Sequence, residues 1–274
     1  MPPSTTAQRS GIARFVSVTG ASDRTAARYM KNASYKLEDA VDAYYQTFGH
    51  GSGNQSSAAL REAPLNQLFD SLRDDKEDPK DSLGANSSMR YLESIGVNLE
   101  DASLFIAMEL LRAPSIGEIT RAGFLEGWKE AGVEAKIPAQ AACIKHLAGL
   151  MPKDRDLFRK VYRYAFVAGK EGEQRALSLD LAMIYWDTLF EKPGQCWASL
   201  AARIDWLEQW KMFLRQNWKR SVNRDMWNQT LEFAFKSLDD SSLSFWSEDG
   251  AWPGVIDEFV AWHKERAKML VDRA

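Results

Sequence analysis

Apolar side chains recur at helical spacing along almost the whole chain, and this periodicity constrains the fold more than any other feature. Leu37, Val41 and Tyr44, for example, occupy one face of a helix. The alternation of apolar and polar residues that indicates a strand hardly occurs. The sequence therefore predicts an all-α protein.

Two blocks of such helices are separated by a stretch rich in glycine and serine. Residues 8–48 hold three short helical patterns, and Ser22 is predicted to cap the second of these helices. Residues 49–57 have the sequence GHGSGNQSS, a composition typical of a flexible linker. We therefore predict a small three-helix bundle at residues 8–48, a linker at 49–63 and a larger multi-helix domain at 64–270.

Cap and stop signals divide the larger domain into short helices. Gly96, Pro114 and Gly132 are expected to end helices, and Thr120 is expected to cap one. The helices expected after these signals are 137–150, 154–168, 178–190, 200–218, 224–238 and 253–268. Paired helices with short loops thus recur along the chain, without a sequence repeat.

The charge balance excludes some classes of function. The formal net charge is -3 and the pI is about 5.8, whereas a general nucleic-acid binder usually has a basic patch and a high pI. The chain has neither a run of about 18 apolar residues that would span a membrane nor an apolar secretory signal at its start. Cys143 and Cys196 lack metal-type spacing and are predicted to be reduced thiols. We expect an intracellular protein of the nucleus, the cytoplasm or both.

One pair of residues is a candidate for catalysis. Cys143 and His146 are three positions apart on one predicted helix, a spacing at which a thiol and an imidazole are neighbours. A small thiol hydrolase would use such a pair. A core cysteine beside a surface histidine explains the same spacing, and no oxyanion loop accompanies the pair. The hydrolase and a purely structural helical interaction module are the alternative functions.

The acidic run from Asp74 to Asp81 suggests a calcium-binding loop between two helices. Such a loop needs a glycine at its sixth position and a glutamate at its twelfth. Counted from Asp74, these positions hold Pro79 and Ala85, and the next register fails in the same way. The sequence also lacks the glycine-rich phosphate-binding motifs. It therefore predicts no metal site and no cofactor, and it does not favour a calcium sensor.

The stretch between Ser237 and His263 carries six acidic residues and neither lysine nor arginine. The acids are interleaved with apolar residues such as Phe245, Trp252 and Ile256. Acidic groups around apolar anchors suit the docking of a basic partner, because opposite potentials steer the encounter. A solvated acidic helix end gives the same pattern, since acids also favour helix N-termini.

A second candidate surface is the apolar stripe formed by Leu104, Ala107, Met108 and Leu111. Most stripes of this kind belong to a core. The small side chain of Ala107 between larger neighbours would leave a slot for an apolar side chain of a partner.

Four segments together resemble the defective-in-cullin-neddylation family. The most specific is DGAWPGVIDEFV at residues 249–260, and KRSVNRDMWN at 219–228 and LDLAMIYW at 179–186 precede it. The N-terminal block, through Phe15 and residues 36–40, resembles the ubiquitin-associated-like (UBA-like) domain of that family. The similarity covers nearly the whole chain in the family's order.

The resemblance implies a fold and a cullin-binding site. The fold is a UBA-like bundle followed by a potentiating-neddylation domain built of helix pairs like those of EF-hands, without metal sites. Family members bind the C-terminal winged-helix region of a cullin through an Asp-Ala-Asp patch. By motif position the patch falls on Asp225, Ala251 and Asp257.

The resemblance also implies a second partner and a role. Family members hold the acetylated N-terminal methionine of the neddylation conjugating enzyme in an apolar groove, which falls here on Leu104, Ala107, Leu111, Ile116 and Ile119. Some animal members of the family have aromatic residues in this groove, where this chain has aliphatic ones. The chain is identified as a fungal-type member. The implied role is a bridging, non-catalytic ligase factor that promotes cullin neddylation, with a UBA-like bundle of the ubiquitin-binding type.

Overall fold

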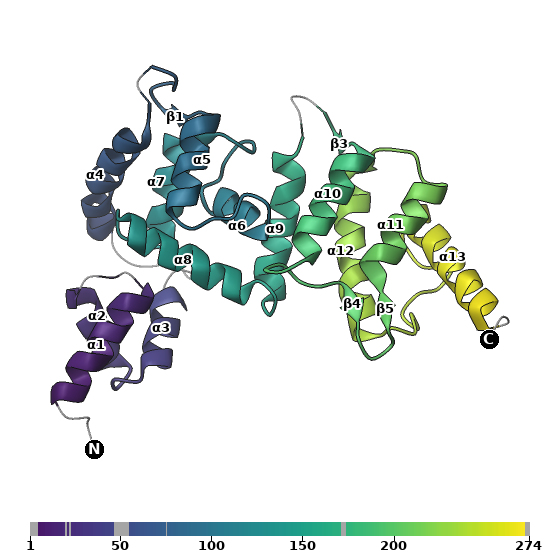
Figure 1. Ribbon diagram of the computed structural model, residues 1–274, viewed down its shortest axis with the longest axis horizontal. Helices are drawn as coiled ribbons and strands as arrows, with labels where there is room; N and C mark the ends of the chain where they lie inside the picture. Colours follow the sequence, from purple (N-terminus) through teal and green to yellow (C-terminus); the bar gives the residue numbers. More distant parts are fainter. Residues whose placement is uncertain are drawn as a thin grey trace. The chain divides into compact units, whose positions relative to one another are not determined.

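The computed structural model describes residues 5–19, 21, 23–46, 55–74, 76–170 and 174–271. The chain folds into two compact units, Met1–Leu150 and Met151–Ala274, and helices dominate both (Figure 1). The all-α fold is confirmed. The paired helices are divided between these two units at Leu150, and the domain bounds 8–48, 49–63 and 64–270 stay a prediction.

The first unit begins with the predicted three-helix bundle. Its helices are α1 (Thr5–Thr19), α2 (Asp23–Asn32) and α3 (Leu37–Gln46). Phe15, Met30 and Tyr44 are buried in its centre, and the rings of Phe15 and Tyr44 meet edge to face with centroids 5.5 Å apart. The predicted cap Ser22 lies outside the described residues.

The rest of the first unit is a pair of helix-loop-helix segments joined by a short strand ribbon. The elements are α4 (Gln55–Leu72), β1 (Ser82–Leu83), α5 (Ala85–Ser94), α6 (Ala102–Leu110), β2 (Ile119–Thr120), α7 (Arg121–Glu130) and α8 (Ile137–Leu150). The antiparallel pairing of β1 with β2 links the two loops, an arrangement compatible with EF-hand-like pairs. Helix α4 starts inside the predicted linker 49–63.

The second unit repeats this arrangement with other residues. Its elements are α9 (Arg155–Ala168), β3 (Ala176–Leu177), α10 (Leu179–Phe190), β4 (Ala198–Ser199), β5 (Ile204–Asp205), α11 (Trp206–Asn217), β6 (Val222–Asn223), α12 (Arg224–Asp239) and α13 (Gly254–Val271). Strands β3 and β6 form the linking antiparallel ribbon. Stacked buried rings fill the core: Tyr162 and Trp227 have centroids 4.4 Å apart, and the rings of Trp186 and Trp227 have centroids 5.3 Å apart.

Two predicted helix boundaries need correction. The helix expected at 200–218 begins at Trp206, because residues 198–205 form the β4–β5 ribbon and the Asp205 side chain accepts a hydrogen bond from the Glu208 amide as the cap of α11. Helix α6 ends at Leu110 and does not continue to Pro114. Arg112, two residues after the helix end, takes a left-handed conformation with φ 48°. The predicted stop at Gly96 and cap at Thr120 are confirmed.

No helix in the described ranges is both long enough and apolar enough to cross a membrane.

Candidate partner-binding surfaces

The starts of helices α12 and α13 form an acidic edge of the second unit, which we define by Asp225, Asp257 and Glu258. Asn223 caps α12 by accepting a hydrogen bond from the Met226 amide at 2.8 Å, and this cap leaves Asp225 exposed in the first turn. Pro253 precedes α13, and Asp257 lies in the first turn of that helix. Each acid thus sits where the helix dipole stabilises negative charge.

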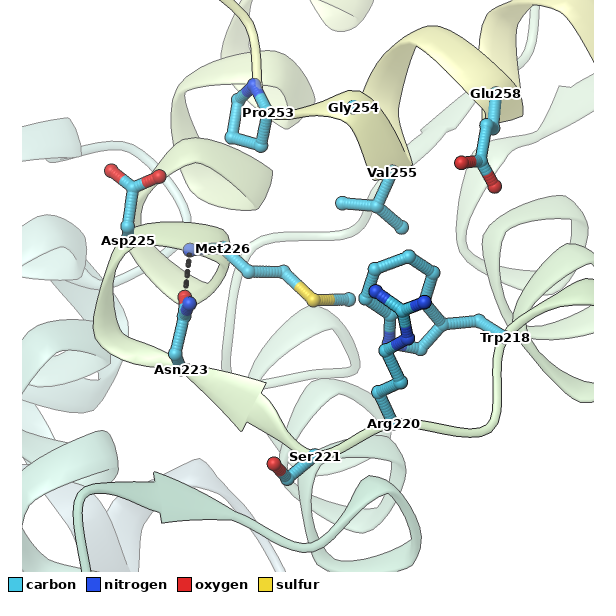
Figure 2. A pocket seen from close by; sticks show the side chains of 10 residues that line it. All are labelled: Trp218, Arg220, Ser221, Asn223, Asp225, Met226, Pro253, Gly254, Val255 and Glu258. Carbon is cyan, nitrogen blue, oxygen red and sulfur yellow. Dashed lines mark hydrogen bonds between the residues drawn. The ribbon is translucent and has the colours of Figure 1, made fainter.

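A pocket of about 290 Å³ opens between these helix starts (Figure 2). Asp225 and Met226 line it from α12, Val255 and Glu258 line it from α13, and Trp218 closes one side. The pocket therefore brings Asp225 close to the start of α13. Ala251 is exposed two residues before Pro253, which also lines the pocket, but neither Ala251 nor Asp257 is a lining residue itself.

Asp257 has a structural contact that its sequence position does not reveal. The Trp246 indole N–H donates a hydrogen bond to Asp257 Oδ1 at 2.8 Å, and the Asp257 side chain is half-buried. The Lys264 ammonium lies 4.3 Å from the centroid of the same indole ring. Asp257 therefore holds the loop before α13 in addition to carrying charge.

Besides Asp257, two more of the six acids between Ser237 and His263 serve the fold. Asp239 forms a two-point ion pair with Arg155, with nitrogen–oxygen distances of 2.6 and 2.9 Å. Asp240 accepts hydrogen bonds from the amides and hydroxyls of both Ser242 and Ser244. Glu248, Asp249 and Glu258 remain exposed, so the surface charge available to a partner is smaller than the sequence count suggests.

The predicted apolar groove residues divide into core and rim. Ala107, Leu111 and Ile119 have no exposed surface and pack inside the first unit. Leu104 is half-buried, and Ile116 is 39% exposed. The structure thus presents two of the five side chains at the surface and places the other three in the core.

Comparison with known proteins gives matches over both units. Residues 11–49 match the UBA-like domain family, and residues 139–262 match the cullin-binding family. Defective in cullin neddylation protein 1 of Pyricularia oryzae is 41% identical to this chain over 272 residues, which span 96% of this chain and 95% of that relative. The chain belongs to the defective-in-cullin-neddylation family.

Other relatives agree with this assignment. DCN1-like protein 5 of Bos taurus is 31% identical over 69% of this chain and 74% of that relative. Defective in cullin neddylation protein 1 of Saccharomyces cerevisiae is 27% identical over 92% of each chain. Family membership confirms the predicted resemblance. Asp225, Ala251 and Asp257 all lie inside the cullin-binding match, whereas the groove residues 104–119 lie before it.

The structure argues against this family member using Cys143 as a nucleophile. Burial raises the pKa of the Cys143 thiol to about 12, so the thiol stays protonated at neutral pH. Catalytic cysteines instead have a lowered pKa in a partly exposed, electropositive setting. Burial also lowers the pKa of His146, against a smaller raising effect of the Asp42 charge.

The acidic loop from Asp74 to Asp81 is held by its own hydrogen bonds. Asp78 accepts hydrogen bonds from the backbone amides of Asp74 and Gly84 at 2.8 and 2.9 Å. Desolvation raises the pKa of Asp78, but hydrogen bonds from the Ser87 hydroxyl and these amides outweigh it and lower the pKa overall. Within the described residues, no group of three or more His, Cys, Asp or Glu side chains is arranged to hold a metal ion.

Sequence reasoning did not single out the large apolar side chains on the α11 and α12 side of the pocket between α12 and α13. Trp218 and Met226 line it, yet their apolar character alone gave no reason to separate them from core residues. The signal was their position, since Trp218 directly precedes the family-like segment 219–228 and Met226 lies within it.

Proposed function

We propose that this family member is a scaffold-type ligase factor that bridges a cullin and the conjugating enzyme charged with the ubiquitin-like modifier. The observation that carries the proposal is the acidic edge, which lies inside the cullin-binding match and is built on the starts of two helices. In this proposal the modifier passes from the thioester cysteine of the conjugating enzyme to a cullin lysine. The chain supplies no reacting group.

The rate gain in such a mechanism comes from proximity. Two reactants held on one scaffold meet at an effective concentration far above their free concentrations, and their relative orientation is restricted. The chain needs separate contacts with each partner and does not need a nucleophile or a base. A reconstituted transfer assay with cullin and charged conjugating enzyme, run with and without this chain, tests the proposal directly.

The cullin contact is assigned to Asp225, Ala251 and Asp257. A carboxylate facing lysine or arginine makes a charge-assisted hydrogen bond, and the small Ala251 side chain permits close approach. Asp225→Lys tests this contact best, because Asp225 is exposed and its side chain forms no hydrogen bond or ion pair with another described residue. We expect the variant to stay folded, with a small drop in melting temperature because a cation replaces an acid at the start of α12, and to lose binding to a C-terminal cullin fragment containing the winged-helix region.

Asp257 needs a different substitution because it also anchors Trp246. Asp257→Asn keeps an oxygen that accepts the indole hydrogen bond and removes the charge. Weaker cullin binding by this variant at an unchanged melting temperature supports a charge contact. Wild-type binding by both Asp225→Lys and Asp257→Asn contradicts the assignment.

The conjugating-enzyme contact is assigned to Leu104, Ala107, Leu111, Ile116 and Ile119. Leu104 and Ile116 are the accessible members of this set, so they would make the first contact with an acetylated N-terminal methionine. A charged, unacetylated amine would be costly to bury there. Ile116→Asp should weaken binding of an acetylated N-terminal peptide of the enzyme, while binding of the cullin fragment stays unchanged.

The UBA-like bundle is proposed to bind ubiquitin or a related protein through an apolar patch. An NMR titration with ubiquitin that shifts no resonance of α1 to α3 would contradict this role.

We also propose residence in the nucleus, the cytoplasm or both, which imaging of the tagged chain tests. The thiol hydrolase alternative predicts that Cys143→Ser abolishes the function of the chain. The bridging proposal predicts that this variant still promotes transfer of the modifier to the cullin.

A further inference from the structure

A second pocket of about 540 Å³ lies beside the pocket between α12 and α13. Its charged lining residues are mainly basic, in contrast to the acidic edge. Arg215, Lys219 and Arg220 line it from the end of α11 and the segment that follows. The start of α10, with its cap residue Ser178, lines the other side. We call it the basic pocket. Asp180 is its one acidic lining residue, so cations outnumber acids by three to one.

These three cations gather at one pocket without counter-charges, whereas three other cations of the same unit are paired. Arg155 pairs with Asp239, Arg159 with Glu232, and Lys211 with Asp187 and Glu208. Arg215, Lys219 and Arg220 are exposed, and none forms an ion pair with any described residue. Like charges gathered without counter-charges repel one another, so the cluster stabilises a complex only when a partner supplies the anion.

The basic pocket and the acidic edge are continuous. Trp218, Arg220 and Ser221 line both pockets, so the segment 218–221 forms the wall between them. The Arg220 guanidinium lies over the Trp218 ring, 5.3 Å from its centroid (Figure 2). The stacked indole holds this cation between the two pockets. A partner seated against Asp225 therefore lies next to Arg220.

We infer that the basic pocket binds acidic side chains of the same cullin region that contacts the acidic edge. This inference rests on the proposed function and extends it: the bound cullin surface must present basic groups to Asp225 and acidic groups to Arg215 and Lys219. Such a two-sign pattern sets orientation, because a partner turned around would place like charges together. A purely basic partner would be repelled at this pocket.

The test uses the full-length chain and a C-terminal cullin fragment with its winged-helix region. Arg215→Glu combined with Lys219→Glu reverses the charge of the basic pocket, and Arg215→Gln with Lys219→Gln removes it. A matched control reverses two exposed cations elsewhere in the second unit, by Lys268→Glu and Lys153→Glu. Lys268, like Arg215, lies in the last turn of a helix, and Lys153, like Lys219, lies in a loop.

Reversal in the basic pocket should weaken cullin binding, whereas the control reversal should not. Reversal in the basic pocket is expected to weaken cullin binding about tenfold, and neutralisation about threefold. The affinity of both variants should depend less on salt concentration than that of the wild-type chain. The control adds the same negative charge at residues that line neither pocket, so binding to a basic client should stay equal or become tighter. Melting temperatures show whether each variant is folded, and the neutralised pair provides the test if the reversed pair unfolds.

Partner-side substitutions complete the test. One Asp or Glu of the cullin fragment, changed to Lys, should restore binding to the pair Arg215→Glu and Lys219→Glu. The inference is overturned if both basic-pocket variants bind as tightly as the control. If Asp225→Lys loses binding in the same experiment, the cullin contact of the proposed function is supported and only the inference about the basic pocket is contradicted. If the wild-type chain does not bind the cullin fragment at all, the proposed function and this inference fall together.

Discussion

Tyr162 illustrates how single residues hold the second core together. Its hydroxyl accepts a hydrogen bond from the Trp186 indole at 2.7 Å and donates one to the Trp227 carbonyl at 2.9 Å. All three residues are buried. Tyr162→Phe leaves the Trp186 indole N–H without an acceptor in the core, whereas the Trp227 carbonyl keeps its place in the hydrogen-bond ladder of α12. The change should cost about 1–3 kcal/mol of unfolding free energy. Chemical denaturation measures this loss, and a variant as stable as the wild type would show that the contact contributes nothing.

The same arrangement recurs in the first core with other elements. The Tyr91 hydroxyl accepts a hydrogen bond from the Trp128 indole and donates one to Gln140, both at 2.9 Å. Tyr91→Phe is therefore the counterpart of Tyr162→Phe and should cost a similar amount. Sequence periodicity places both tyrosines in a core, but it does not reveal their hydrogen-bond partners, which come from helices far away along the chain.

Acid stability should depend on the loop that follows α12. Hydrogen bonds from Ser242 and Ser244 hold the pKa of Asp240 well below its ordinary value of 3.8, and the Arg155 pair lowers the pKa of Asp239. A folded-state pKa below the unfolded value stabilises the fold above about pH 4, and this contribution is lost as the pH falls further. Denaturation from about pH 6 to pH 3 should show the loss, with a shallower decline for Asp240→Asn. An identical pH profile for the variant would contradict this role.

At the level of elements, helices α6 and α7 approach closely because glycines face α6. A Cβ atom added at Gly127 would lie 2.1 Å from the Leu110 carbonyl oxygen, and one at Gly123 would lie 2.2 Å from that of Leu111. Gly127→Ala should therefore force the helices apart and destabilise the chain by about 1–3 kcal/mol.

Gly149 provides the matched control for Gly127. It lies near the end of α8, and an added Cβ would meet nothing within 4 Å. Gly149→Ala should leave stability unchanged or raise it by a few tenths of a kcal/mol, since alanine favours helix. Thermal or urea unfolding of the two variants separates a packing effect from a propensity effect. Equal behaviour of the two would contradict the close-approach explanation.

The helices were predictable where the local signals agreed. The helix at 137–150 has the predicted bounds, and the structure confirms the stop at Gly96 and the cap at Thr120. The strands were not predictable, since ribbons of two residues are too short to show alternation. The predicted start at Leu200 was wrong because Asp205 caps α11 and Leu200, 92% exposed, lies in the ribbon turn.

The candidate site was predictable from its motif and not from spacing. Asp225 and Asp257 are 32 positions apart, and only the resemblance connected them. For the groove, helical spacing does not distinguish a slot from a core, and Ala107, Leu111 and Ile119 turned out to be buried. The basic pocket had no sequence signal of its own, because Arg215 and the start of α10 meet only in the fold.

At the scale of the whole molecule, the two proposed contacts belong to different units. The acidic edge and the basic pocket lie in the unit from Met151 onward, and the groove residues lie in the unit that ends at Leu150. A scaffold with two separate contacts has a kinetic property that an allosteric activator lacks. At high concentration, separate copies of the scaffold occupy the cullin and the conjugating enzyme, and the ternary complex disappears.

The transfer rate should therefore rise and then fall as the concentration of this chain increases. Asp225→Lys gives the control, since it should occupy the conjugating enzyme without recruiting the cullin, and thus inhibit transfer when added to the wild-type chain. Ile116→Asp should inhibit from the cullin side for the same reason. Mixing the two variants should not restore the rate, because neither carries both contacts. A rate that saturates without falling, or a mixture that recovers full activity, would contradict bridging by a single chain.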